Sequence, residues 1–337
     1  MKIGKVDTDI NVAIVAEIGN NHEGSVALAK ELISSAVKAG ADAVKLQMIN
    51  PYRFVSKLEV DRLKILEKFS LSESEIRELF NYANENGIYL FASAFDHSSA
   101  QILSNLTSTI KIASGDITHH SFIEFIANFG KDIILSTGAS DFKEIADAVS
   151  IINVTWKKLQ IKPNLGLLHC ISEYPADPST INLRAINALK QKFPNITIGY
   201  SDHTIGIENS ILAVAAGAHI IEKHFTIDKH YSEFRDHALS ADYKELKELR
   251  NRIGELEIQL GSGMKFPTIA EERTKNSLRR SVYAAKGLKK GQTITFEDMI
   301  CLRPDIGIPA NKIMGLVGKK LLRDVSEGNL LQVEDFD

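Results

Sequence analysis

The sequence contains only two cysteines among its 337 residues, Cys170 and Cys301, and they lie far apart along the chain. Two distant cysteines give neither the spacing of a zinc site nor the number that a disulfide framework needs. Reduced thiols are the simpler interpretation, and they are typical of a cytoplasmic protein. The scarcity of cysteine therefore argues against a small disulfide-stapled protein and favours a fold held together by a hydrophobic core.

The sequence also lacks a large excess of charge and a long apolar run. Its formal net charge is −3, so bulk charge would not draw it to nucleic acid or to anionic lipid. No stretch approaches the roughly 18 apolar residues of a membrane-spanning helix. The amino-terminal MKIGKVDTDI has no apolar segment of the kind found in secretory signals. We therefore expect no nucleic-acid partner, no membrane partner and a cytoplasmic location.

Up to about residue 260, short β-branched and apolar runs alternate with longer stretches of helical periodicity. The strand-like runs are residues 12–18, 43–48, 88–93, 110–113, 132–136, 165–170, 196–200 and 219–223, and the helical stretches include 25–39, 72–86, 121–128, 141–152, 183–192, 208–216 and 242–260. About eight such units are typical of an α/β TIM (β/α)8 barrel. Alternation alone also fits a doubly wound open sheet. The barrel is favoured because the strands are short and apolar and no GxGxxG follows the first strand.

The composition and the hydrophobic periodicity of the sequence change near Gly261. Residues 261–280 are rich in Gly, Lys and Arg and are predicted to form a linker, so the barrel domain is assigned to residues 1–260. Residues 281–337 contain short strand-like runs broken by turns and predict a small, mostly β domain. A domain of this size has a marginal core of its own, so we expect it to pack on its own barrel or on a partner's.

Polar and titratable residues gather where the predicted strands end. In chain order they are Glu17, Lys45, Gln47, Ser93, Lys111, Ser114, Asp116, Ser136, His169, Ser172, Tyr174, Ser201, His203, Glu222 and His224. Each has an ordinary explanation by itself, since a strand lysine often snorkels to solvent and a Ser-Thr-Gly turn usually caps a helix. Those explanations do not account for the gathering at one end of so many strands, which is where TIM barrels carry active sites.

The residue types indicate the chemistry of the expected site. Lys45, Lys111 and the Ser- and Gly-containing turns supply ammonium, hydroxyl and N–H groups that suit a phosphate. His203 and His224 follow neighbouring strands, and two converging imidazoles can hold a divalent metal. Glu17 is a candidate acid or base.

Several motifs together resemble those of the sialic acid synthase (N-acetylneuraminate synthase) family. They are AEIGNNHEG at 16–24, VKLQ at 44–47, KIASGD at 111–116, ILSTG at 134–138, LLHC at 167–170, SEYP at 172–175, GYSDHT at 199–204 and IEKHFT at 221–226. RRSVYAAKGLKKGQ at 279–292 and RPDIGIPA at 303–310 are similar to that family's antifreeze-like (SAF) domain. The resemblance implies a TIM barrel followed by a SAF domain, in a homodimer whose small domains are swapped between barrels.

The resemblance also implies an activity, the condensation of phosphoenolpyruvate with an open-chain N-acyl amino sugar. It implies a divalent cation, usually Mn²⁺ with Mg²⁺ or Co²⁺ as alternatives, on His203 and His224, and a catalytic role for Glu17, Lys45 and Lys111. The positions that match phosphoenolpyruvate contacts are Lys45, Ser93, Lys111, Ser114, Ser136, Ser172 and Ser201. The positions that match sugar contacts are Gln47, Asp116, Tyr174, Asp236 and, from the small domain, Arg303.

Two departures from the family pattern bear on the sugar. Asp305 follows Arg303-Pro304 where SAF sequences often have glycine, and EFRDH at 233–237 stands where many relatives read PGPD before the sugar-facing aspartate. The second change leaves the identity of the sugar open between N-acetylmannosamine and a 2,4-diacetamido sugar. Two other functions remain as alternatives: a Schiff-base aldolase acting through Lys45 or Lys111, and a non-enzymatic sugar-binding protein.

Overall fold

Eight parallel strands close into a barrel in the order β10-β3-β4-β5-β6-β7-β8-β9. The computed structural model describes all residues from Met1 to Asp337 and divides them into two units, Met1–Gly261 and Ser262–Asp337. The barrel strands of the first unit are β3 (Ala13–Gly19), β4 (Ala43–Met48), β5 (Tyr89–Ala94), β6 (Thr109–Ile112), β7 (Asp132–Ser136), β8 (Leu165–Cys170), β9 (Thr197–Asp202) and β10 (Ile220–His224). The predicted barrel is therefore confirmed.

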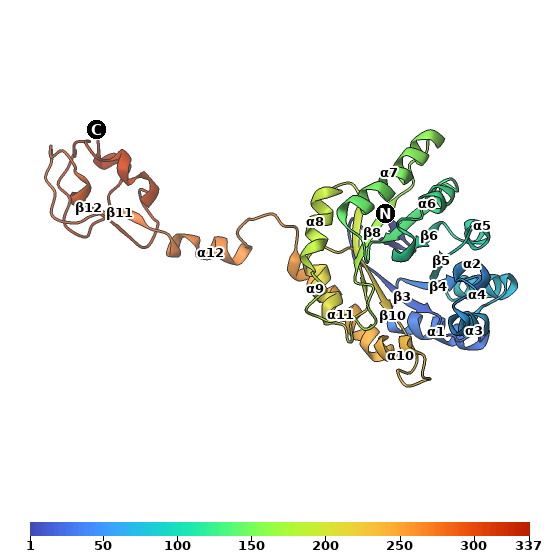
Figure 1. Cartoon of the computed structure of the whole chain (residues 1–337). Coiled ribbons are helices and arrows are strands. Elements are labelled where there is room, and N and C mark those ends of the chain that lie inside the picture. Colours follow the sequence, from blue (N-terminus) through green and yellow to red (C-terminus); the bar gives the residue numbers. More distant parts are fainter. The chain divides into compact units, whose positions relative to one another are not determined.

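Helices surround the barrel on its outside (Figure 1). Those that follow the strands are α1 (Val26–Ala39), α4 (Glu73–Glu85), α5 (His97–Leu106), α6 (His120–Ala127), α7 (Phe142–Leu159), α8 (Arg184–Lys192), α9 (Glu208–Ala215) and α11 (Tyr243–Leu260). Ser72, Asp141 and Asp242 each form a capping box at the amino end of a helix. No helix in the protein combines the length and the apolar character needed to cross a membrane.

Side chains of the barrel strands point alternately outward, into an apolar layer beneath the helices, and inward. The inward side chains are apolar at the amino-terminal end of the barrel and polar at its carboxyl end. Side chains between the barrel and the helices form the main core, which includes Tyr200 and Ile221. Inside the barrel, a smaller apolar cluster that includes Val15, Phe91 and Ile220 fills the amino-terminal end. Because side chains alternate along a strand, the next inward residue is two positions further on, and Glu222, two residues after Ile220, reaches the carboxyl end of the barrel.

Four features of the first unit were not expected from the periodicity. A hairpin of β1 (Lys2–Ile3) and β2 (Val6–Asp7) precedes the barrel, and its Ile3 joins the apolar cluster inside the barrel. An arm of two short helices, α2 (Pro51–Phe54) and α3 (Val60–Phe69), is inserted after β4. A one-turn helix η1 (Ser114–Asp116) follows β6, and a short helix α10 (Arg235–Leu239) follows β10.

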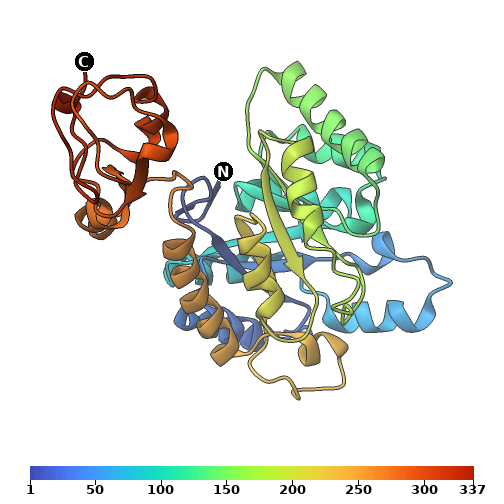
Figure 2. The ribbon, with the colours of Figure 1, turned by 90° about the vertical axis from the view of Figure 1, so that its left-hand side faces the viewer.

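The second unit has little regular structure. It contains helix α12 (Ile269–Leu278), strands β11 (Ser281–Ala284) and β12 (Met299–Leu302), which pair antiparallel, and the short helices η2 (Phe296–Asp298), η3 (Ala310–Gly315) and η4 (Val333–Asp335). Its long connections between the short elements are seen in Figure 2. Half of segment 261–280, predicted as a linker, belongs to α12. A separate cluster of buried apolar side chains, among them Val282, Ile294 and Leu331, forms this unit's core.

Candidate active site

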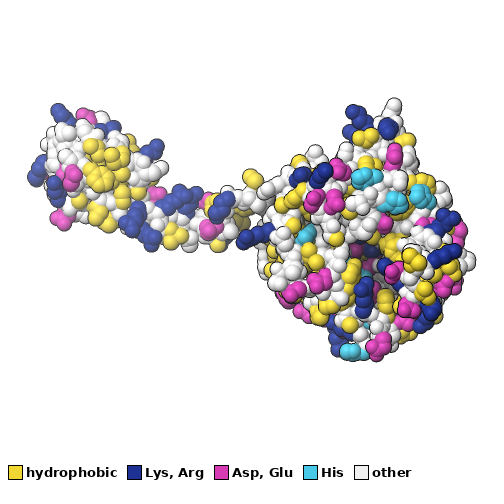
Figure 3. Space-filling view, viewed as in Figure 1, with side chains coloured by type: hydrophobic (Ala, Val, Ile, Leu, Met, Phe, Trp, Pro, Cys, Tyr) yellow, Lys and Arg dark blue, Asp and Glu magenta, His cyan; other side chains and the backbone are white.

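The carboxyl ends of the barrel strands open into one cavity of about 1420 Å³. The hollow is visible on the barrel unit in Figure 3, with acidic and basic side chains around it. The residues of this unit that the sequence assigned to catalysis, substrate or metal all line it: Glu17, Lys45, Gln47, Ser93, Lys111, Ser114, Asp116, Ser136, Ser172, Tyr174, Ser201, His203, His224 and Asp236. His169, which the sequence also placed at a strand end, does not line the cavity, and its Nε2 lies 2.7 Å from the carbonyl oxygen of Ile181. Arg303 follows β12 in the second unit. The volume exceeds the roughly 300–1,000 Å³ of a pocket for one small ligand, so two substrates fit.

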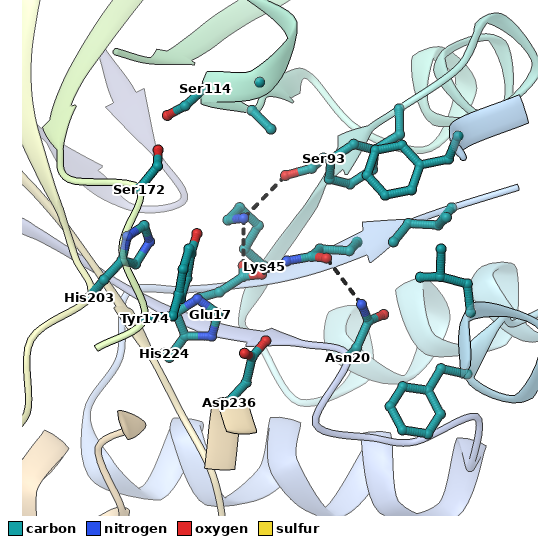
Figure 4. Close-up of a pocket in the computed structure, with 18 of the residues that line it drawn as sticks. Glu17, Asn20, Lys45, Ser93, Ser114, Ser172, Tyr174, His203, His224 and Asp236 are labelled. Atoms are coloured by element: carbon teal, nitrogen blue, oxygen red, sulfur yellow. Dashed lines mark hydrogen bonds and ion pairs between the residues drawn. The ribbon is translucent and has the colours of Figure 1, made fainter. Parts of the chain in front are cut away.

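Four buried charged side chains form a network at the centre of the cavity. The Lys45 Nζ lies 2.6 Å from Glu17 Oε2 and 3.7 Å from Glu222 Oε2, and the Lys111 Nζ lies 3.5 Å from Glu222 Oε1. The Lys45 ammonium also donates to Ser93 Oγ at 3.1 Å, and the amide of Gln47 donates to Glu17 Oε1 at 3.0 Å. Figure 4 shows the Glu17–Lys45–Ser93 line of contacts. Two ammonium groups and two carboxylates therefore balance one another in a region shielded from water.

Burial and ion pairing shift the pKa values of these groups in different directions. Burial raises the pKa of Glu17, although the Lys45 ammonium opposes that rise. Burial would lower the pKa of Lys45, but the carboxylates of Glu17 and Glu222 together raise it. Burial lowers the pKa of Lys111, which has weaker support from Glu222. Glu17 is consequently the carboxyl group best suited to exchange a proton, and Lys45 stays an ammonium.

A cluster of small side chains forms a cradle beside the lysines. The backbone N–H of Gly138 donates to Ser114 Oγ at 3.0 Å, and Ser114 Oγ lies 3.1 Å from Cys170 Sγ. A Cβ placed at Gly138 would lie 2.7 Å from Cys170 Sγ and 2.9 Å from Ser114 Oγ, and it would collide with Ser172 Oγ. Only glycine therefore keeps this space open for hydroxyl and N–H donors, which is an arrangement that suits an anion.

The two predicted metal-binding histidines lie close together, with ring centroids 5.6 Å apart. The carbonyl of Ile171 accepts from Nδ1 of His203 at 2.6 Å, so in the neutral ring Nε2 carries the free lone pair. Nδ1 of His224 is buried and has no hydrogen-bond partner. Burial lowers the pKa of both imidazoles.

Neutral imidazoles with a free nitrogen fit the donor set of a divalent cation. No group of three or more His, Cys, Asp or Glu side chains is arranged as a ready-made metal site. The protein thus offers two nitrogen ligands on adjacent strands, and other ligands would come from bound molecules.

The far end of the cavity is lined by aromatic and acidic side chains. The Tyr174 ring stacks on the imidazole of His203 at 4.1 Å, and the Arg235 guanidinium lies 4.9 Å from the centroid of the same tyrosine ring. Burial raises the pKa of Asp116 to about 6 and also raises that of Asp236. One oxygen of Asp116 is buried without a hydrogen-bond partner, so a ligand with hydroxyl or amide donors would satisfy it.

Sequence comparison identifies the family to which this architecture belongs. The profile of the NeuB family matches residues 32–265, and that of the SAF domain matches residues 279–337. The chain belongs to the NeuB family. The resemblance inferred from the motifs is therefore confirmed, as is the SAF domain at the carboxyl end.

Relatives of the chain are named as synthases of several different acids. The chain is 37% identical to an N,N'-diacetyllegionaminic acid synthase of Legionella pneumophila, over 96% of this chain and 94% of the relative. It is 34% identical to a pseudaminic acid synthase of Campylobacter jejuni, over the whole of both chains. The crystal structure of an N-acetylneuraminic acid synthetase from Leptospira borgpetersenii, in complex with citrate, is 34% identical and superposes with a TM-score of 0.76 over 82% of this chain and 94% of that one.

Within this NeuB-family site, several lining residues were not assigned from the sequence. Glu222 is the most central of them, and its signal was its place in IEKH two residues before His224, which puts both on the inner face of β10. Gly138 was missed because its role depends on Ser172 and Cys170, which are distant in sequence. The helical arm α2–α3 contributes Phe54 and Phe69 to the cavity wall, and nothing in its periodicity indicated this.

Proposed function

We propose that this NeuB-family chain condenses phosphoenolpyruvate with an open-chain N-acyl amino sugar to give a nine-carbon 2-keto acid and inorganic phosphate. The sugar is N-acetylmannosamine or a related 2,4-diacetamido sugar. The observation that carries the proposal is the pairing of two buried lysines with a serine and glycine cradle in one cavity with two neutral histidines. A small polyanion and a carbonyl-bearing sugar have complementary sites there.

Phosphoenolpyruvate binds at the inner end of the cavity in this proposal. Its phosphate and carboxylate bind to the ammonium groups of Lys45 and Lys111 and to the hydroxyls of Ser93, Ser114, Ser136, Ser172 and Ser201. The Gly138 backbone leaves room for the phosphate oxygens beside Ser114 and Cys170, where an added methyl group would collide. Charge-assisted hydrogen bonds from buried donors are the strong ones, so this end supplies most of the affinity for the anion.

The sugar occupies the outer part of the cavity, beside Gln47, Asp116, Tyr174 and Asp236. His203 and His224 would hold a divalent cation, Mn²⁺ or alternatively Mg²⁺ or Co²⁺, which when bound supplies Lewis-acid polarisation of the sugar aldehyde. Tyr174 stacks against His203 and so keeps that imidazole from rotating. The carbonyl of Ile171 keeps its Nδ1 protonated and its other nitrogen available.

The chemical step joins C3 of phosphoenolpyruvate to the aldehyde carbon, and the aldehyde oxygen takes up one proton to become a hydroxyl group. The attacking water balances this step, because it loses two protons in all, the equivalent of one to this oxygen and one to the departing phosphate. Water adds to the electron-poor C2, and the C2–O bond to phosphate then breaks, which leaves the 2-keto group. Glu17 takes the proton of the attacking water, a role that suits a carboxyl group with a raised pKa. Lys45, 2.6 Å away, and Lys111 stabilise the negative charge on the departing phosphate.

Arg303 and the second unit complete the proposal. We assign Arg303 to the N-acyl group of the sugar bound in a partner's barrel, in a homodimer whose SAF domains are swapped. The core of the second unit is small and consists of a single cluster, and exposed apolar side chains such as Ile306, Met314 and Val333 remain on its surface. Docking on another surface would bury such side chains.

The Schiff-base alternative requires a neutral lysine. Lys45 is unsuited to that role, because its carboxylate neighbours raise its pKa. Lys111 is the better candidate, since burial lowers its pKa. Borohydride in the presence of pyruvate would trap a Schiff base on Lys111, and the proposed synthase reaction forms no such adduct.

The test of the proposed function is phosphate release from phosphoenolpyruvate in the presence of Mn²⁺ and a panel of open-chain amino sugars. The panel contains N-acetylmannosamine, its 6-phosphate and 2,4-diacetamido-trideoxy hexoses, each with and without EDTA. We expect metal-dependent release with one sugar of the panel and a product three carbons longer than that sugar. Absence of phosphate release with every sugar and every cation would refute the proposal.

A further inference from the structure

One buried ion pair lies directly behind the histidines and has no place in the proposed chemistry. The Lys223 Nζ is 3.4 Å from Asp202 Oδ2, and both side chains are completely buried. Asp202 and Lys223 face each other in the register of β9 and β10. Each immediately precedes a histidine, so their side chains point to the outside of the barrel while His203 and His224 line the cavity.

The ion pair holds the backbone on the carboxyl side of His203. Asp202 Oδ1 accepts from the backbone N–H of Thr204 at 2.9 Å and from the Thr204 hydroxyl at 2.7 Å. The ammonium of Lys223 donates to the carbonyl oxygen of the same Thr204. Asp202 Oδ2 accepts from the hydroxyl of Ser210 on α9 at 2.6 Å. Both backbone groups of the residue after His203 are thus fixed by a strand pair and a helix.

The pair is costly as a source of stability alone. Removing two charges from water costs several kcal/mol per ion, and apolar residues of similar volume are often as stabilising or more so. The surrounding layer between barrel and helices is apolar, with Tyr200 and Ile221 on the same two strands. A charged pair at this place therefore suggests a requirement for geometry, since it fixes positions that an apolar pair would leave adjustable.

On the inner face, a second contact joins the same two strands one residue earlier. The Ser201 hydroxyl donates to Glu222 Oε1 at 2.9 Å. The two strands are therefore tied together by side chains on both faces just before the histidines. The residue that follows each histidine is also held in place. Thr204, after His203, is held by the ion pair, and the backbone N–H of Phe225, after His224, donates to the carbonyl of Glu17 at 2.8 Å.

We propose that Asp202 and Lys223 are positioning residues that fix the separation of the His203 and His224 imidazoles, and thereby set the affinity of the site for a divalent cation. The inference rests on the proposed function, since it assigns the cation to these histidines. Residues that orient metal ligands typically change metal affinity by about 10–100-fold when they are altered.

The test compares three variants by titration with Mn²⁺, in which the electron paramagnetic resonance signal reports free Mn²⁺. Lys223→Met removes the donor to Thr204. The double variant Asp202→Asn with Lys223→Met removes both charges but keeps an acceptor for Thr204. Arg250→Met is the control, because it breaks an ion pair with Asp42 (2.9 Å) just before the amino end of β4.

We expect the Kd for Mn²⁺ to rise by about 10–100-fold in the double variant, while its melting temperature stays near that of the wild type. Arg250→Met should leave the Kd unchanged even where it lowers the melting temperature. Excess Mn²⁺ should restore phosphate release to the double variant, because the cation site is weakened and not lost. A merely structural role would instead lower the melting temperature together with the affinity, since an excess of Mn²⁺ can also rescue a destabilised protein by binding its folded state.

The outcomes separate this inference from the proposed function. Wild-type protein that binds Mn²⁺ and releases phosphate, beside a double variant with an unchanged Kd, overturns the positioning role and leaves the synthase function intact. The same holds where Arg250→Met weakens Mn²⁺ binding as much as the double variant does. Wild-type protein without affinity for Mn²⁺ overturns both the assignment of the cation and the inference built on it.

Discussion

Replacement of Asp116 by asparagine should stabilise the protein at neutral pH and weaken its activity. Asp116 ends the short helix η1 after β6, and one of its carboxyl oxygens is buried without a hydrogen-bond partner. Burial raises its pKa from 3.8 to about 6. At pH 7.5 the folded protein therefore carries a carboxylate that its surroundings disfavour. Asparagine has nearly the same shape and carries no charge.

The expected size follows from the shift in pKa. A raised carboxyl pKa contributes stability that is fully present below pH 3.8 and is lost as the pH rises toward about 6. A shift of about two units corresponds to at most about 3 kcal/mol at neutral pH. Since Asp116 is only partly buried, solvent screening reduces this to about 1–2 kcal/mol. For a unit of this size the melting temperature should rise by about 2–8 °C.

The assay is thermal unfolding followed by circular dichroism at pH 7.5 and pH 4. The gain in melting temperature of Asp116→Asn should be clear at pH 7.5 and small at pH 4, where most of the wild-type carboxyl is protonated in the folded state. Asp61→Asn is the control, because that side chain is 97% exposed. Equal gains at both pH values, or a loss of stability at pH 7.5, would refute the reasoning. The same variant should raise the KM for the sugar, in line with the exchange of stability for function at active sites.

Further predictions concern the proposed chemistry and assembly. Glu17→Gln should fold, keep its hydrogen bond with Gln47 and lose about 10²–10⁴-fold in kcat for phosphate release; near-normal kcat would mean that another group handles the proton. Gly138→Ala should raise the KM for phosphoenolpyruvate at least about tenfold while circular dichroism stays native, because the methyl group collides with Ser172 and comes within 2.7 Å of Cys170 Sγ; an unchanged KM would remove Gly138 from the anion site. His224→Ala should abolish Mn²⁺-dependent activity, as measured by titration of the EDTA-treated protein, and full recovery at micromolar Mn²⁺ would contradict the assignment. Mixing inactive Glu17→Gln with inactive Arg303→Ala protein should regain about a quarter of the activity by exchange of subunits if the SAF domains are swapped, and no recovery despite proven exchange would argue against swapping.

The sequence predicted the barrel and most of its cavity for a definite physical reason. Strands buried on both faces must be apolar, so any charged residue at a strand end stands out against its background. Lys45, Lys111 and His224 were recognisable in this way, and the structure brings them to one cavity. The second unit was less predictable in detail, because its strands are only four residues long and its remaining pairings are isolated bridges.

The residues that the sequence did not reveal depend on partners in other elements. Gly138 matters because Ser114 of η1, Cys170 of β8 and Ser172, just after β8, leave no room for a side chain on its α-carbon. The α2–α3 arm was not predicted, and Leu66 and Phe69 are the buried residues of α3, although the arm forms part of the cavity wall. Asp202 and Lys223 stand at strand ends beside His203 and His224, but the sequence does not show that they pair with each other. In each case the decisive information is a contact between segments that one-dimensional periodicity does not encode.

The position of the charge network on the barrel explains why its members are so closely interdependent. Glu17 lies on the first barrel strand, and Glu222 and His224 lie on the last, and these two strands pair to close the barrel, with His224 opposite Glu17. Lys45 on β4 contacts carboxylates from both of them, at 2.6 Å and 3.7 Å. A buried charge is tolerated only with its partner in place. The lysines therefore acquire their full set of partners only when β10 docks on β3, so the anion site and the acid–base group that we propose would form in the same event as the closed barrel. A chain whose barrel failed to close would expose unpaired charges and would not form a partly active site. We therefore expect substitutions that alter the pairing of β3 with β10 to affect folding and catalysis together.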